Sequence, residues 1–98
     1  MTKRERGSAE RTSANAYFVY LLECADGSLY TGITTDAARR VAEHNGDGDS
    51  GARYTRGRRP VQLVYLETAA TRADAARREA AIKRLNRARK LALCAPPD

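Results

Sequence analysis

Three apolar runs, each closed by a polar turn, stand out along the chain. Residues 17–24 combine aromatic, β-branched and aliphatic side chains and end at an Asp26-Gly27 turn signal, which predicts a strand. Residues 29–33 follow as its hairpin partner, and residues 61–67, after Pro60, predict a third strand. The sequence therefore predicts a hairpin and one further strand.

Helical spacing fills the intervals between these strands. Residues 36–45 predict a helix that Asp36 or Thr35 caps and Gly46 ends. Arg40 and His44, four residues apart, lie at one edge of its apolar stripe, and Arg39 and Glu43 are expected to face water. The stripe itself is expected to consist of Ala37, Ala38, Val41 and Ala42.

Two more helices are predicted near the carboxyl end. Thr71 and Asp74 resemble a capping box that opens a helix to about Leu85, and residues 87–93 form a short last helix. Residues 46–51 form a flexible polar linker by composition, and residues 53–59 a basic segment that is irregular or briefly helical. The fold class is α+β, with a three-stranded, largely antiparallel sheet flanked by helices.

With 98 residues, the chain has room for one domain, which we place at residues 16–94. Residues 1–15 carry almost no large apolar side chain and are expected to be a disordered basic and polar tail, and residues 95–98 form a second tail. No segment approaches the roughly 20 apolar residues of a membrane span, so a cytoplasmic protein without a membrane partner is expected. Cys24 and Cys94 are read as two reduced thiols rather than a disulfide framework.

Positive charge predicts the partner. The formal net charge is +6, and clustered cations favour nucleic acid because neutralising phosphates releases counterions. A general bias toward arginine is the alternative. One segment concentrates the charge around an aromatic ring, where it can follow a phosphate backbone and stack a base, although a solvated loop has the same composition: Arg53, Tyr54, Arg56, Arg58 and Arg59.

The candidate chemistry begins with Tyr20 and Tyr30, which flank the hairpin turn. A two-residue loop would place the two rings on opposite faces of the hairpin. A three-residue loop, residues 26–28, with Gly27 left-handed, pairs Cys24 with Tyr30 and puts both tyrosines on one face. We therefore predict an odd loop or a bulge.

Several motifs in order resemble the GIY-YIG nuclease superfamily, and within it the small bacterial proteins that consist of this domain alone. The resemblance spans residues 17–93 and rests on Val19-Tyr20-Leu21, Tyr30-Thr31-Gly32, Arg40, His44-Asn45 and Glu79, with Asp26 to Gly32 and Arg53 to Arg56 in support. The first motif lacks the glycine that names the family, and Thr31 fills the middle of the second. Neither change removes a reacting group.

The resemblance implies roles for the matching residues. One of Tyr20 and Tyr30 activates the attacking water and the other orients it, without an indication of which does which. Arg40 binds the scissile phosphate, His44 lies near the nucleophile, and Glu79 holds one divalent cation, Mg²⁺ or Mn²⁺. Structural positions complete the motif: Gly27, Gly32 and Asn45.

A tyrosine has a reference pKa of about 10, so it acts as a base only where nearby cations lower that value. Arg40, a metal ion and protonated His44 are the expected sources. Each residue also has a plainer interpretation: strand tyrosines are common, Arg40 can be a solvated helix residue, and Glu79 can pair with Lys83 one turn on.

The function expected from these residues is a metal-dependent endonuclease that hydrolyses phosphodiester bonds in nucleic acid, with DNA, branched or damaged, as the first candidate and RNA as another. Targeting by a protein partner is expected, because larger relatives are directed by attached domains. The alternative is a nucleic-acid-binding module with the same fold and little or no catalysis. A partner-docking domain leaves the tyrosine, arginine and glutamate set unexplained.

Overall fold

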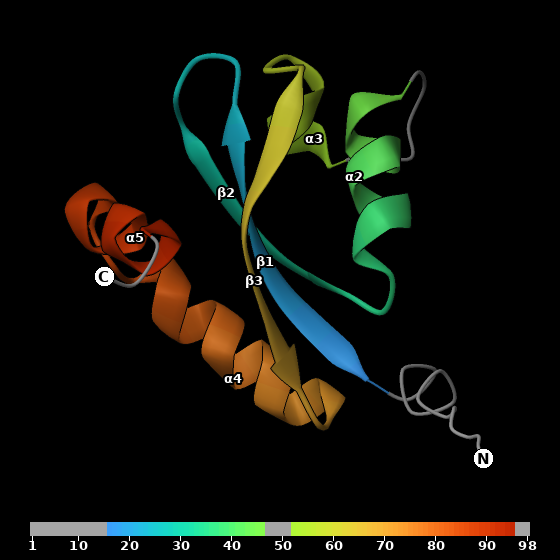
Figure 1. Ribbon diagram of the computed structural model, residues 1–98, viewed down its shortest axis with the longest axis vertical. Helices are drawn as coiled ribbons and strands as arrows, with labels where there is room; N and C mark the ends of the chain where they lie inside the picture. Colours follow the sequence, from blue (N-terminus) through green and yellow to red (C-terminus); the bar gives the residue numbers. More distant parts are fainter. Residues whose placement is uncertain (1–15, 47–51, 96–98) are drawn as a thin grey trace.

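The computed structural model describes residues 16–46 and 52–95 (Figure 1). Both predicted tails, apart from Ala95, and most of the predicted linker lie outside this part of the chain. In chain order the described elements are β1 (Tyr17–Cys24), β2 (Leu29–Thr34), α2 (Ala37–Asn45), α3 (Arg53–Arg56), β3 (Val61–Ala69), α4 (Arg72–Lys83) and α5 (Arg87–Cys94).

The three strands form one antiparallel sheet with the order β2-β1-β3. The predicted α+β class is confirmed. β1 has the predicted bounds, whereas β2 continues to Thr34 and β3 to Ala69, past the ends that the apolar runs indicated. A bulge in the β1–β3 ladder lies between Leu21 and Leu22.

An odd loop closes the β1–β2 hairpin, as predicted, but its position differs. The register pairs Tyr20 with Gly32 and Leu22 with Tyr30, so the three loop residues are 25–27. The predicted pairing of Cys24 with Tyr30 is therefore wrong by two positions. Gly27 has φ +85, which glycine adopts without steric cost, and its N–H donates to the carbonyl of Cys24. Because strand side chains alternate with a period of two, a register shift of two positions leaves each side chain on the same face, so both tyrosines still lie on one face of the sheet.

Helices cover both faces of the sheet (Figure 1). On one face, even-numbered β1 residues pack with Val41 of α2 and Val61 of β3. On the other, Val19 and Leu21 pack with Ala75 and Ile82 of α4. Alternation along β1 thus divides the core into two layers, because successive strand side chains point to opposite faces.

The caps of the helices follow the sequence, but the buried side of α2 does not. Asp36 accepts a hydrogen bond from the N–H of Arg39, and Thr71 from that of Asp74, as predicted. Ala38 and Ala42 are exposed, so these two members of the predicted stripe are wrong, whereas Ala37 and Val41 do face inward. The inner side of α2 carries Ala37, Arg40, Val41 and His44, which follow one another at helical spacing.

Asn45 joins the end of α2 to the start of β3. Its side-chain amide donates to the carbonyl of Val61 at 2.9 Å, and its carbonyl oxygen accepts from the N–H of Val61 at 2.7 Å. This two-way bridge fixes α2 against the sheet and gives Asn45 the structural role expected for it.

Two further expectations concern the whole chain. In the described residues no helix is both long and apolar enough to cross a membrane. Cys24 is a buried free thiol and Cys94 a half-buried one, as predicted for the two cysteines.

Candidate active site

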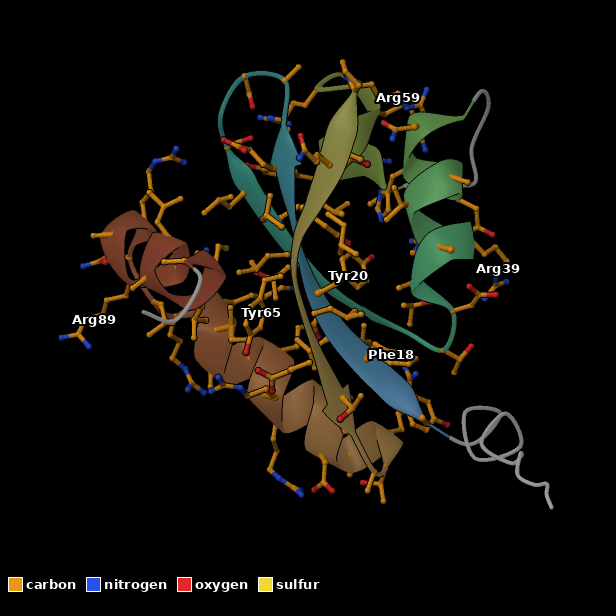
Figure 2. All side chains as sticks on the ribbon, viewed as in Figure 1. Phe18, Tyr20, Arg39, Arg59, Tyr65 and Arg89 are labelled. Atoms are coloured by element: carbon orange, nitrogen blue, oxygen red, sulfur yellow. The ribbon has the colours of Figure 1, made fainter. Side chains whose placement is uncertain are left out.

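The site begins where Tyr20 lies across Gly32, its partner in the β1–β2 ladder. A Cβ at position 32 would lie 2.5 Å from the Tyr20 hydroxyl oxygen. Because glycine has no side chain, the Tyr20 ring can extend over β2 toward α2. Figure 2 shows Tyr20 on the α2 side of the sheet and Tyr65 on the α4 side. Gly32 is thus the residue that allows the ring to reach the site.

Tyr20 and His44 meet between the sheet and α2. The Tyr20 hydroxyl lies 3.0 Å from Nε2 of His44, and the other ring nitrogen, Nδ1, lies 2.7 Å from the hydroxyl oxygen of Thr55. His44 and Thr55 are fully buried, and Tyr20 is 1% exposed. The three side chains come from β1, α2 and α3, so the tertiary fold assembles this row.

Burial determines the charge of His44. It lowers the pKa of the imidazole to about 4, and the positive charges of Arg40 and Arg59 act in the same direction. The carboxylate of Glu43 opposes them. His44 is therefore neutral near pH 7. The expectation that protonated His44 lowers the pKa of a tyrosine is wrong for the protein without substrate.

Arg40 links Tyr20 to Glu43. Its guanidinium hydrogen-bonds the Glu43 carboxylate at 2.9 Å and also the Tyr20 hydroxyl. Glu43 is 28% exposed in its side chain and, contrary to expectation, serves to hold Arg40. Arg39 does point into solvent, as predicted, with 57% of its side chain exposed (Figure 2).

The balance of these contacts leaves Tyr20 protonated. Burial raises the pKa of Tyr20 to about 12, although the hydrogen bond and charge of Arg40 lower it. The charges of Tyr30 and Glu79 add to the rise. Without substrate, then, Arg40 does not bring Tyr20 below its ordinary pKa, and any activation depends on groups that arrive with the substrate.

Tyr30 lies at the more open side of the same group. Its ring centroid is 6.3 Å from that of Tyr20 and 5.3 Å from that of His44, and Tyr30 is half-buried. The two signature tyrosines thus share a site, as the hairpin parity predicted. Tyr54 continues the row outward, 5.7 Å from Tyr30 by ring centroid.

The basic segment divides into internal and exposed cations. The Arg58 guanidinium lies 4.1 Å above the Tyr54 ring and pairs with Asp26 at 3.1 Å. Arg59 donates to the His44 carbonyl at 2.6 Å. Arg53 and Arg56 are exposed. The predicted base stacking on Tyr54 is limited to what Arg58 leaves uncovered, since one face of the ring already carries a guanidinium.

Glu79 comes from a different layer of the fold than the tyrosines, Arg40 and His44. It belongs to α4, which packs on the face of the sheet opposite α2. Its carboxylate pairs with Lys83 at 3.4 Å, and 23% of its side chain is exposed. Its charge still raises the pKa of Tyr20, so the two groups interact electrostatically.

The donor set limits what metal site these residues can form. Across residues 16–46 and 52–95, no group of three or more histidine, cysteine, aspartate or glutamate side chains is arranged to hold a metal ion. Magnesium commonly takes one or two protein carboxylates together with waters and substrate phosphate. A single accessible carboxylate at Glu79 fits that chemistry, and such a site would require the substrate to complete it.

Two residues of the site were missed in the sequence. Thr55 gives no periodic signal, because it lies on a four-residue helix, and its burial follows only from tertiary contacts. Glu43 did carry a signal: it stands three residues after Arg40, the spacing of a helical ion pair.

A cavity of about 380 Å³ lies elsewhere, where β1 and β3 meet beside the hairpin loop. Its lining includes Cys24, Pro60 and Gln62, and none of the two signature tyrosines, Arg40 or His44.

Residues 16–92 match the family model of the GIY-YIG catalytic domain. The chain belongs to the GIY-YIG family. This family is one of nucleases, so its class of substrate is nucleic acid. The GIY-YIG match covers β1 and nearly all of the chain to α5, including every element that contributes to the site.

Relatives of this GIY-YIG chain include the UPF0213 proteins of Desulfotalea psychrophila and Halobacterium salinarum. The first is 58% identical over 82 residues, which cover 84% of this chain and 74% of that protein. The second is 57% identical over 77 residues, which cover 79% and 97%. The chain also resembles the solution structure of the UPF0213 protein of Bacillus halodurans, with a TM-score of 0.50, 45% identity and coverage of 80% and 81%.

Proposed function

We propose that this GIY-YIG protein is a divalent-metal-dependent endonuclease that hydrolyses phosphodiester bonds in DNA. One observation carries the proposal: the Tyr20 hydroxyl is held between the Arg40 guanidinium and the neutral imidazole of His44, with Tyr30 beside them. Phosphodiester hydrolysis needs a base for the attacking water and positive charge near the phosphate, and this group contains both.

Arg40 is the residue that binds the scissile phosphate. It carries a permanent charge, is partly exposed, and already spans from Glu43 to the Tyr20 hydroxyl. When the phosphate accepts hydrogen bonds from the Arg40 guanidinium, the buried Tyr20 hydroxyl beside it becomes accessible. Binding of the phosphate therefore opens the site at the point where the water must be activated.

The two tyrosines then divide the work. Tyr20 is the base, because its hydroxyl has an acceptor for its own proton in Nε2 of His44 at 3.0 Å. Tyr30, half-buried at the open side, orients the water by hydrogen bonding. Neutral His44 suits this role because its lone pair is available to the Tyr20 hydroxyl near pH 7, and with a pKa of about 4 the imidazole would hold the proton only during the attack.

Glu79 would hold the metal ion, Mg²⁺ or Mn²⁺, together with phosphate oxygens of the substrate. When bound, the ion supplies positive charge that stabilises the negative charge developing on the phosphate. Glu79 must leave Lys83 to do so, and because the Lys83 side chain is exposed and the two groups are 3.4 Å apart, this exchange costs little.

The substrate we favour is DNA of branched or damaged structure, cut with little sequence preference. The described cations that surround the site are suited to phosphates, which carry no sequence information. A protein partner would direct the enzyme to its targets.

A binding module without catalysis is the second candidate. The position of Glu79 favours it, because α4 packs on the face of the sheet opposite Tyr20 and the carboxylate is paired with Lys83. In such a module the cations would bind phosphates, and no metal would be needed.

Cleavage of supercoiled plasmid and of a four-way DNA junction separates the two candidates. The wild type is expected to cut in Mg²⁺ and to stop in EDTA. Glu79→Gln is expected to lower the rate by about 10²-fold or more, and Lys83→Gln, which removes only the ion-pair partner, to leave it near the wild-type value. A wild type that binds but never cuts in Mg²⁺ or Mn²⁺ would establish the module instead.

A further inference from the structure

Thr55 is a fully buried polar residue that has no role in the chemistry proposed above. It lies in α3, and its hydroxyl oxygen is 2.7 Å from Nδ1 of His44. The same oxygen is 3.0 Å from the carbonyl oxygen of Ala52, three residues earlier. A buried hydroxyl in contact with an imidazole can determine which ring nitrogen carries the proton.

Thr55, His44 and Tyr20 form a row of hydrogen bonds, with the Ala52 carbonyl at one end and Arg40 at the other. The two ends determine the direction of each hydrogen bond in the row. A carbonyl only accepts, so the Thr55 hydroxyl donates to Ala52 and its oxygen accepts from Nδ1–H of His44. Nε2 then carries the lone pair and accepts from the Tyr20 hydroxyl. Arg40, which only donates, hydrogen-bonds the Tyr20 oxygen at the other end. Each of the three side chains in the row thus donates once and accepts once.

The other tautomer, with the proton on Nε2, satisfies these groups less well. Its one advantage is that Nδ1 could then accept from the N–H of Ala52, at 3.4 Å the longest contact of the group. With the proton on Nε2, however, Tyr20 would receive donors from both His44 and Arg40, and its own proton would lose its acceptor at His44. Tyr20 is 1% exposed, whereas Ala52 is half-buried. Losing the partner of the more deeply buried donor costs more, so the Nδ1–H tautomer is favoured.

We propose that Thr55 is a positioning residue that fixes His44 as its Nδ1–H tautomer, with the Nε2 lone pair directed at Tyr20. Thr55 would act as the third group that orients a base in nucleophilic enzymes. The inference about the tautomer stands on the contacts alone, and its consequence for the reaction rests on the proposed nuclease function.

The surroundings of His44 bear on any measurement of its protonation. From β1 and β2 the imidazole faces Tyr20 and Tyr30. Charged groups from α2 and from the segment before β3 also act on it: Arg40, Glu43 and Arg59. These charges are the same in the wild type and in variants at position 55, which makes comparison between them direct.

His44 is the only histidine of the chain, so ¹H–¹⁵N correlation spectra of its ring nitrogens require no assignment among several rings. The wild type near pH 7 is expected to show a protonated Nδ1 and an unprotonated Nε2. Thr55→Ser keeps the hydroxyl and is expected to keep this pattern. Thr55→Val, which replaces the hydroxyl by a methyl group, is expected to lose it through a mixture of tautomers or the opposite one.

Cleavage rates provide the second reading. General base catalysis contributes about 10²- to 10⁴-fold, so misdirecting the imidazole by Thr55→Val should lower the rate by at least about tenfold, and Thr55→Ser should restore most of it. A protonated Nε2 in the wild type, or an Nδ1–H tautomer that persists in Thr55→Val, would overturn the inference. A wild type that does not cleave contradicts the nuclease function, and the spectra alone then decide the role of Thr55.

Discussion

Tyr20 can reach His44 only because its partner across the β1–β2 ladder is Gly32. A Cβ at position 32 would lie 2.5 Å from the hydroxyl oxygen and 2.6 Å from the ring carbon that bears it. Both distances are too short for non-bonded atoms. Tyr20 of the first signature motif therefore requires a glycine at position 32, in the second motif, to hold its ring in this position.

Gly32→Ala is expected to move the Tyr20 ring and to destabilise the protein, because overpacking a buried site costs about 1–3 kcal/mol. Gly57→Ala is the matched control, since no atom lies within 4 Å of the Cβ that it would add. Its free energy of unfolding should stay constant or rise by up to about 1 kcal/mol. Urea denaturation checks both variants. Equal stabilities for the two would show that the Tyr20 ring has room to shift.

The lowered pKa of His44 makes stability depend on pH. An unfolded histidine titrates near pH 6.5, whereas folded His44 titrates at about 4, so the unfolded chain binds more protons between these values. Stability is therefore greatest above pH 6.5 and falls as the pH is lowered toward 4. The loss between pH 6.5 and 5, where most carboxylates stay ionised, should be about 2 kcal/mol. Urea denaturation at a series of pH values measures it.

His44→Gln provides the control for this pH dependence. The chain has one histidine, so this variant removes the only side chain that ordinarily titrates in the window. Its stability should be nearly constant between pH 6.5 and 5. The same slope in the variant and in the wild type would show that another group is responsible.

The basic segment should give two kinds of variant. Arg53 is exposed, so Arg53→Ala should leave stability unchanged and, if Arg53 contacts a phosphate, reduce the slope of log K against log salt by about one. Arg59→Ala removes the donor to the His44 carbonyl and should destabilise the fold by about 1–3 kcal/mol. DNA-binding titrations at several salt concentrations and urea denaturation distinguish them. A stable Arg59→Ala protein would contradict the internal role.

Local chemistry made most of the fold predictable. The bounds of β1, the caps at Asp36 and Thr71 and the left-handed Gly27 follow from residues adjacent in the sequence. The shared face of Tyr20 and Tyr30 followed from parity, which a shift of the register by two positions does not alter.

Contacts between distant segments were not predictable in the same way. Ala38 and Ala42 were wrongly placed on the inner side of α2, because an alanine has little surface to bury and the side is determined by His44 and Val41. Thr55 became part of the site only through the packing of α3 against α2. The position of α4, and with it Glu79, depends on which face of the sheet the chain crosses after β3, and no local pattern specifies that choice.

The central claim is that Arg40 and the tyrosines form a catalytic site, and the most direct test compares Arg40 with its neighbour. Single-turnover cleavage of a DNA junction in Mg²⁺ should slow by about 10²- to 10³-fold in Arg40→Ala, the usual effect of losing one well-placed electrostatic group. Arg39→Ala removes an equal charge from the solvent-exposed side of the same helix and should cleave at nearly the wild-type rate. Equal rates for the two variants would contradict the account.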